Sequence, residues 1–171
     1  MASSTSDSAS AAEPRTVALA SIAAQVSALD ELIALAQRRI RVFDNDLSQM
    51  GWDRAARIAR LGAFLRGQDG RTLDLIVHDT GYLERSCPGL LTLLRTYSHA
   101  VTIYRTGDEA KRATDPLVIV DELHHLHRFH YEQPRATLGV NQPEQTRPLA
   151  LRYEEIWATG EPGINATVLG L

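Results

Sequence analysis

The stretch from Thr114 to Asp121, which reads Thr-Asp-Pro-Leu-Val-Ile-Val-Asp, decides the fold that the sequence predicts. Residues 117–120 are four consecutive apolar residues, a pattern that predicts a short strand. The pattern of residues 125–131 predicts a second strand, which returns beside the first as an antiparallel neighbour. A sheet built around residues 117–120 is therefore the centre of the predicted fold.

On either side of this pair, strands and helices alternate. Further strands are predicted over residues 39–43, 73–77 and 100–104, and residues 73–77 are expected in the sheet interior with both faces covered. Helices are predicted after a capping box that begins at Ser27, and over residues 52–65, 88–95 and 144–158. Alternation of this kind indicates βαβ units with right-handed crossovers. The predicted class is α/β, with a mixed, mainly parallel sheet and helices on both faces.

Length and composition predict one domain over residues 16–171, after a flexible Ser/Ala-rich leader over residues 1–15. Residues 16–21 form either a short strand or a helical lead-in. The tail from residue 160 is expected to dock as a last short strand.

Composition also limits the kinds of partner and the cellular compartment that the sequence predicts. The net charge of -3 argues against general nucleic-acid binding, because nucleic-acid-binding domains are usually basic. The single cysteine, Cys87, excludes an internal disulfide and fits a reducing compartment. No apolar run reaches the roughly 18 residues that a membrane span requires. These features predict a cytoplasmic protein.

The order of these segments resembles one half-domain of the phospholipase D superfamily. The likeness runs from Asp30 to Trp157. It rests on four pieces: an opening helix and strand over residues 30–43, a second strand over residues 71–77, a signature strand over residues 117–121, and the late Asn141 followed by a helix that ends Tyr153-Glu-Glu-Ile-Trp157. More narrowly, the chain is similar to a group of bacterial proteins that have this fold and lack the catalytic motif.

Residues 114–121 depart from the superfamily signature H-x-K-x-x-x-x-D. Thr114 stands in the histidine position and Pro116 in the lysine position, and only the final Asp121 is retained. In active members, one histidine attacks phosphorus, another protonates the leaving group, and the lysines hold phosphate oxygens. Threonine has no basic nitrogen and proline has no donor. The resemblance therefore implies the fold without its phosphodiester chemistry.

Two groups of polar residues are candidate sites. Ligands of open parallel sheets bind beyond the carboxyl ends of the strands. The residues predicted there form a candidate binding cleft: Asp44, Asp46, His78, Asp79, Arg105 and Asp121. His78 and a carboxylate could act there as a general acid–base pair, whereas the competing interpretation is that these residues only cap helices and turns.

The second group is the pair His125 and His127, which share one face of the predicted strand. With Asp121 or Glu122 they could bind a metal ion. The competing interpretation is a half-exposed strand that carries histidines on its surface.

The sequence favours a non-catalytic binding or interaction module for a protein or small-molecule ligand, with no cofactor and no structural zinc. The alternative is a metal-assisted or histidine-based hydrolase using His78, His125 and His127. A homodimer is expected, because the halves of the superfamily pair across a symmetric face. Its surface is either the aromatic side of residues 125–131, with Phe129 and Tyr131, or the region of Trp52.

The pattern of charged residues indicates one further candidate binding surface. Four arginines lie along the helix predicted over residues 52–65: Arg54, Arg57, Arg60 and Arg66. This row either meets an anionic partner or forms an ordinary solvated face.

Overall fold

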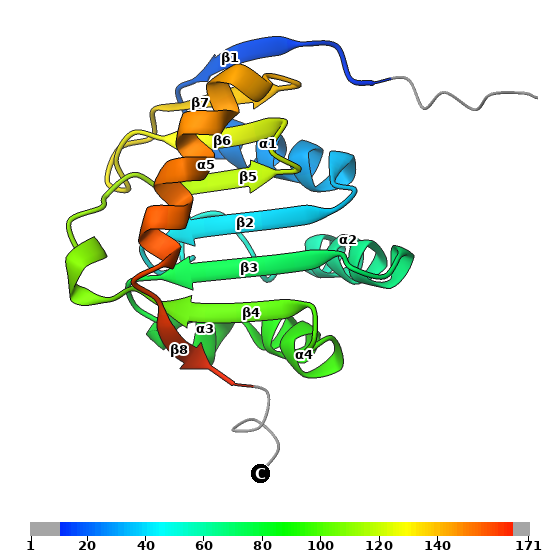
Figure 1. Cartoon of the computed structure of the whole chain (residues 1–171), viewed down its shortest axis with the longest axis vertical. Helices are drawn as coiled ribbons and strands as arrows, with labels where there is room; N and C mark the ends of the chain where they lie inside the picture. The colour runs from blue at the N-terminus through cyan, green and yellow to red at the C-terminus, as the bar shows by residue number, and fades with distance from the viewer. Residues whose placement is uncertain (1–10, 166–171) are drawn as a thin grey trace, which may run out of the picture.

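An eight-stranded sheet forms the centre of the computed structural model, which describes residues 11–165 (Figure 1). The strands lie side by side in the order β1-β7-β6-β5-β2-β3-β4-β8. Their bounds are β1 Arg15–Leu19, β2 Arg39–Asp44, β3 Thr72–Val77, β4 Val101–Arg105, β5 Leu117–Val120, β6 His124–Arg128, β7 Ala136–Val140 and β8 Glu161–Ile164.

The sheet is mixed, as predicted, but its parallel part is confined to β2, β3 and β4. Every other neighbouring pair is antiparallel, so the expected mainly parallel character is wrong. The reason lies in the connections. β5, β6 and β7 follow one another without a helix between them, and strands joined by short turns must run antiparallel.

Helices cover both faces of the sheet, as predicted (Figure 1). One face carries α1 (Ile22–Leu35), α2 (Ala55–Gly67), α3 (Gly81–Ser86) and α4 (Pro88–Thr96), and α5 (Pro143–Trp157) crosses the other. Alternation along the strands divides the side chains between two cores. Val42, Leu75 and Val77 pack under α1–α4, whereas Phe43 and Ile76 pack under α5.

Several predicted elements hold. β3 lies inside the sheet between β2 and β4, with Leu75 and Val77 fully buried, which confirms its predicted position. Residues 117–120 form a strand with the predicted limits. Residues 15–19 form a strand, which was one of the two predicted alternatives for this segment. The segment after residue 160 forms β8, which pairs with β4 as the predicted last short strand.

Other elements differ from the prediction. The first helix begins after Ser21, whose hydroxyl oxygen accepts the Ala24 N–H at 3.1 Å, and not at Ser27. α3 and β7 were not predicted. α3 is only six residues long. β7 contains Gly139, a residue that usually argues against a strand. Here a side chain at Gly139 would collide with the ring of His125, so the glycine leaves room for that ring.

The described residues can also be compared with the predictions of a flexible leader and of no membrane span. β1 begins at Arg15, the last residue of the predicted leader, and residues 1–10 lie outside the described residues. Among residues 11–165, none of the helices combines the length and the apolar character that crossing a bilayer requires.

Candidate functional site

The carboxyl ends of β2, β3 and β4 hold five of the six residues predicted to form a cleft. Asp44 and Arg105 end β2 and β4, and Asp46, His78 and Asp79 directly follow strands.

The sixth residue, Asp121, is elsewhere. Because β5 runs antiparallel to β2, Asp121 lies at the amino end of β2. There its carboxylate accepts three backbone N–H groups, from Gln37 at 2.7 Å, Arg38 at 2.8 Å and Arg39 at 2.9 Å. The prediction that Asp121 joins the other five is therefore wrong, and its contacts give it a structural role.

Most rim side chains have local partners. His78 donates from Nε2 to the Ala113 carbonyl oxygen at 2.7 Å, and its Nδ1 lies 2.6 Å from the Thr106 hydroxyl. The Asp79 carboxylate accepts the Gly81 N–H at 2.7 Å. The Asp46 carboxylate accepts the Ser48 N–H at 3.0 Å, and Arg105 lies 3.4 Å from Glu161. These are turn, cap and edge contacts of the kind that the competing interpretation describes.

Asp44 is the one buried carboxyl of the rim. Burial raises the pKa of Asp44 to about 6, although the Asn45 N–H donates to its carboxylate at 2.6 Å. With Pro116 and Arg128, it lines a cavity of about 20 Å³, which is enough for about one water molecule. The rim therefore contains a perturbed carboxyl, but this cavity is too small for an organic ligand.

The two histidines of the predicted metal site, His125 and His127, lie on β6 and are held separately under α5. The Nδ1 atom of His125 lies 2.8 Å from the Thr146 hydroxyl, and burial lowers the pKa of His125 to about 4. The Nε2 atom of His127 lies 2.9 Å from a carboxylate oxygen of Asp115. Burial alone would raise the pKa of Asp115, but hydrogen bonds from His127 and Arg152 outweigh it and lower the value to about 2.

These contacts bear on the predicted metal site. Within residues 11–165, no three His, Cys, Asp or Glu side chains are arranged to hold a metal ion. Each histidine is instead occupied by a partner of its own.

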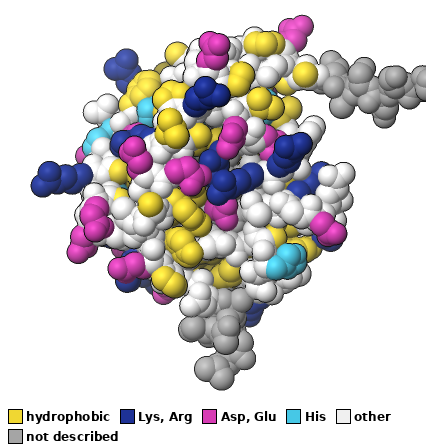
Figure 2. All heavy atoms as spheres, in the orientation of Figure 1, with side chains coloured by type: hydrophobic (Ala, Val, Ile, Leu, Met, Phe, Trp, Pro, Cys, Tyr) yellow, Lys and Arg dark blue, Asp and Glu magenta, His cyan; other side chains and the backbone are white. Residues whose placement is uncertain are grey.

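A second site, which the sequence did not predict, lies on the α5 face. A cleft of about 690 Å³ opens there, lined by residues of β2, of the β5–β6 turn and of α5. We call it the arginine cleft and define it by Arg39, Arg41, Glu122, Leu123, Arg147, Leu151 and Glu154. Figure 2 shows basic and acidic side chains next to one another on this face, with hydrophobic side chains around them.

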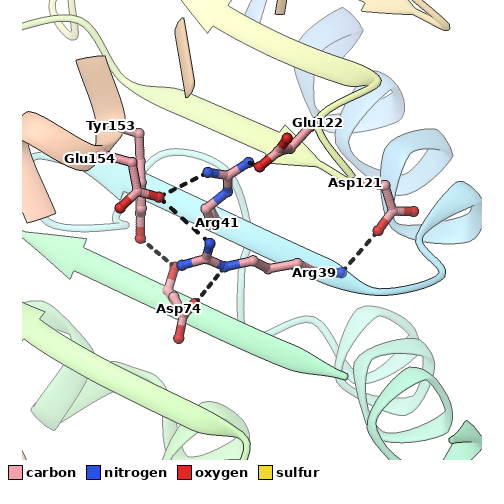
Figure 3. Close-up of polar contacts among 7 residues, drawn as sticks. All are labelled: Arg39, Arg41, Asp74, Asp121, Glu122, Tyr153 and Glu154. Atoms are coloured by element: carbon pink, nitrogen blue, oxygen red, sulfur yellow. Dashed lines mark hydrogen bonds and ion pairs between the residues drawn. The ribbon is translucent and has the colours of Figure 1, made fainter. Parts of the chain in front are cut away.

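Arg41 is the centre of the cleft (Figure 3). Its side chain is 1% exposed, and its guanidinium carbon lies 5.7 Å from the centre of the Tyr153 ring. Nη1 donates to Glu154 at 2.9 Å, and Nη2 makes a longer contact of 3.4 Å with Glu122. Among residues 11–165, the buried Nε atom finds no hydrogen-bond partner.

The neighbouring side chains hold this arrangement in place (Figure 3). Arg39 donates from Nε to Asp74 at 3.0 Å and lies 3.5 Å from Glu154. Burial raises the pKa of Asp74, and Arg39 opposes that effect. The Tyr153 hydroxyl donates to the Asp74 carbonyl oxygen at 3.0 Å, which fixes α5 against β3.

Glu122 is the more weakly held of the two carboxylates that contact Arg41. Its side chain is 72% exposed. It sits in a tight turn with Asp121, and the two residues have φ angles of 56° and 55°. Consecutive left-handed residues are normally Asn or Gly, because other side chains are strained there. The more exposed of the two carboxylates that contact Arg41 therefore comes from a strained turn.

One signal of this cleft was present in the sequence. Arg41 interrupts the apolar residues of β2, and Asp74 does the same in β3. The two are paired in register across the parallel strands, so both point to the α5 face. Opposite charges in two adjacent buried strands were thus a readable sign of a polar site.

Comparisons with known proteins agree with this fold. No curated protein matches the chain. Among solved structures, TrmBL2, described as an archaeal chromatin protein with a novel mode of DNA binding, aligns with a TM-score of 0.65 at 11% identity, over 88% of this chain and 55% of that one. This chain thus spans about half of TrmBL2.

Two further solved structures align with this chain over nearly their whole length. Nuc from Salmonella typhimurium, described as a phospholipase D family member, gives a TM-score of 0.60 at 15% identity, over 87% of this chain and 97% of that one. NucT from Helicobacter pylori gives 0.58 at 12% identity, over 88% and 99%. At these identities the likeness establishes a phospholipase D-like fold and nothing more. A family model matches residues 21–169, and the chain belongs to that family, described as Domain of unknown function (DUF7931).

Proposed function

We propose that the protein is a non-catalytic binding module built on the phospholipase D-like fold. The observation that carries this proposal is the chemistry at the start of β5. In the alignment with the signature, Thr114 and Pro116 take the catalytic positions. Their carbonyl oxygens accept the N–H groups of Tyr131 at 2.8 Å and Arg128 at 3.0 Å. Neither side chain is an acid, a base or a cation at neutral pH.

The hydrolase alternative has less support. A general base must have a nitrogen or oxygen free to take the substrate proton. Both ring nitrogens of His78 are already within hydrogen-bonding distance of protein groups. His125 is buried against Thr146, and His127 is paired with Asp115.

A phosphodiesterase assay tests the proposal. Purified protein is incubated with bis(p-nitrophenyl) phosphate, and an active member of the phospholipase D superfamily serves as the positive control. We expect release of nitrophenol at the rate of buffer alone. Turnover that survives His78→Ala, His125→Ala and His127→Ala but is lost in Thr114→Ala would overturn both the proposal and the signature alignment.

Nucleic-acid binding is a second candidate, favoured by the surface of α2. Arg60 and Arg66 are exposed, Arg54 lies exposed at the start of the helix, and α2 contains no acidic residue. Arg57, predicted as part of this row, is instead buried. The weak net charge does not decide against this candidate, because TrmBL2, with the same fold, is described as binding DNA.

Fluorescence anisotropy with a labelled DNA duplex tests this candidate. Binding through α2 should weaken steeply with salt, because phosphate contacts release counterions. It should also be lost in the double variant Arg60→Glu, Arg66→Glu. Arg112→Glu, at an exposed position outside α2, is the matched control and should leave binding unchanged. Equal loss in the control would assign any binding to overall charge alone.

A further inference from the structure

We propose that the arginine cleft binds an organic carboxylate with an apolar body, and that Glu122 occupies the carboxylate position until the ligand displaces it. This inference rests on the proposed function as a binding module and names the ligand class.

The first argument is the state of Arg41. A guanidinium group presents a planar fork of donors that matches a carboxylate. Glu154 already uses one arm of this fork at 2.9 Å. The other arm meets Glu122 at 3.4 Å, which is longer than the roughly 2.7–2.9 Å of a good charge-assisted hydrogen bond. The buried cation therefore has one strong carboxylate partner and one weak one.

The second argument is the position of Glu122. A side chain that is 72% exposed can swing away without uncovering the core. Glu154 is different, because it lies within reach of both Arg39 and Arg41 and stands on a packed helix. An incoming carboxylate would therefore replace Glu122 and leave the remaining contacts of Arg41 in place.

The third argument is the apolar wall of the cleft. Leu123 and Leu151 are 39% and 61% exposed, and they are two of the four exposed large hydrophobic residues found in the described chain. Arg147 stands one turn before Leu151, on the same side of α5. The cleft volume of about 690 Å³ falls within the roughly 300–1,000 Å³ typical of small-ligand pockets.

Charge and apolar surface together define the ligand class. An inorganic anion would satisfy Arg41 and Arg147 and leave the two leucines in water. A neutral apolar molecule would cover the leucines and leave Arg41 with its weak partner. A carboxylate with a hydrocarbon body uses both parts of the cleft.

Octanoate is the probe, titrated into the ¹⁵N-labelled protein and followed by amide chemical shifts. We expect the amides of residues 121–123 and 147–154 to move. Inorganic phosphate and octanol should bind in the cleft roughly tenfold more weakly than octanoate or not at all. Phosphate lacks the hydrocarbon body, and octanol lacks the carboxylate. N-acetyl-leucine is titrated alongside, and tighter binding than octanoate would indicate the end of a peptide as the natural source of the carboxylate.

Variants locate the site. Leu151→Ser and Arg41→Lys should weaken octanoate binding by about tenfold, because they remove the apolar wall or the fork. Glu122→Gln should tighten binding by roughly threefold to tenfold, because it removes the competing charge. Arg112→Gln, outside the cleft, should change nothing. If Arg41→Lys does not fold, the variants at the exposed positions Leu151 and Glu122 still test the proposal.

Three results would overturn the inference: shifts confined to other residues, phosphate binding as tight as octanoate binding, or an affinity unchanged by Leu151→Ser and Glu122→Gln. The two proposals fail separately. Absence of octanoate binding rejects the ligand class and leaves the non-catalytic function standing. Phosphodiester turnover rejects the non-catalytic function, whatever octanoate does.

Discussion

Asp44 carries a burial penalty that the other rim carboxylates avoid. It is 9% exposed and ends a central strand, and Arg128 is the cation that partly offsets its charge. Burial raises the pKa of Asp44 from 3.8 to about 6. The folded protein therefore binds a proton at Asp44 over a pH range in which the unfolded chain has already released it.

This difference predicts the pH dependence of Asp44→Asn. Because the folded-state pKa is the higher one, ionisation of Asp44 costs nothing below about pH 4 and its full penalty above about pH 6. At pH 8 we expect the variant to be more stable than wild type by up to about 3 kcal/mol. The advantage should vanish toward pH 4, as measured by urea unfolding at a series of pH values. An advantage of equal size at both ends would contradict the burial argument.

At the scale of single elements, the β5–β6 turn connects β5 to β6 and also contacts the start of β2. The Asp121 carboxylate accepts the backbone N–H groups that precede and open β2, and the next residue supplies Glu122 to the arginine cleft. Backbone hydrogen bonds thus explain Asp121, the residue that the sequence resemblance matches to the last position of the superfamily signature. Its presence needs no catalytic role.

Asp121→Ala should accordingly destabilise the fold without altering any chemistry. Removing the carboxylate leaves three N–H groups without their acceptor, of which the one at Arg39 is partly buried. We expect a loss of about 1–3 kcal/mol in the free energy of unfolding. Glu122→Ala, in the same turn, is the matched control and should stay within about 1 kcal/mol of wild type, because its side chain is exposed. Equal losses would mean that the turn conformation, and not the carboxylate, is what matters.

Helix α2 shows that its arginines are not equivalent. Arg57 is 1% exposed and donates to Asp30 at 2.9 Å, to the Gly51 carbonyl at 2.9 Å and to the Val26 carbonyl at 3.1 Å. It also donates to the Met50 carbonyl. Its side chain lies against the ring of Trp52, so it joins α1, α2 and the preceding loop.

Arg57→Met should therefore cost about 3 kcal/mol or more in thermal or chemical unfolding, because several buried carbonyl groups lose their donor together. Arg60→Met, one turn later on the exposed side, should stay within about 0.5 kcal/mol of wild type. Similar values for the two variants would contradict the bonding described for Arg57.

At the scale of the whole molecule, the structure excludes one of the two surfaces predicted for a homodimer and leaves the other as a prediction. Trp52 is 2% exposed, so it cannot form an interface, and that suggestion is wrong. Phe129 is 49% exposed, and its ring makes a T-shaped contact with the ring of His127. The two histidines predicted on the same strand are both held by side chains of the same molecule, since His125 is buried next to Thr146 and His127 is paired with Asp115.

We predict that Phe129→Ser weakens self-association by at least roughly tenfold in sedimentation velocity, because it removes an aromatic anchor. Val17→Ser, an exposed apolar residue on the edge strand β1, is the control and should have no effect. A wild-type protein that remains monomeric at high concentration would remove the dimer from consideration.

The sequence predicted the layers of this molecule better than its sites. Strands such as β3 and β5 were readable because continuous apolar runs report burial, whatever their neighbours are. Asp121 was misplaced because an apolar run does not give the direction of its strand. The arginine cleft escaped notice because β2, the β5–β6 turn and α5 meet only in the folded chain. Arg57 was misread because a long side chain at a buried helical position looks the same in sequence as one on a solvated face.

The order of strands in the sheet has a consequence for synthesis of the chain. Among the strands of residues 11–165, β1 pairs with β7 alone, and the outer neighbour of β4 is β8. A chain emerging from the ribosome therefore holds β1 without its partner until residues 136–140 have been made. Contacts this distant in sequence slow folding, because a long loop must close before they form. The domain should thus acquire its full structure only after β7 and β8 have been translated, and a transcript truncated before residue 136 should yield a product that chaperones retain.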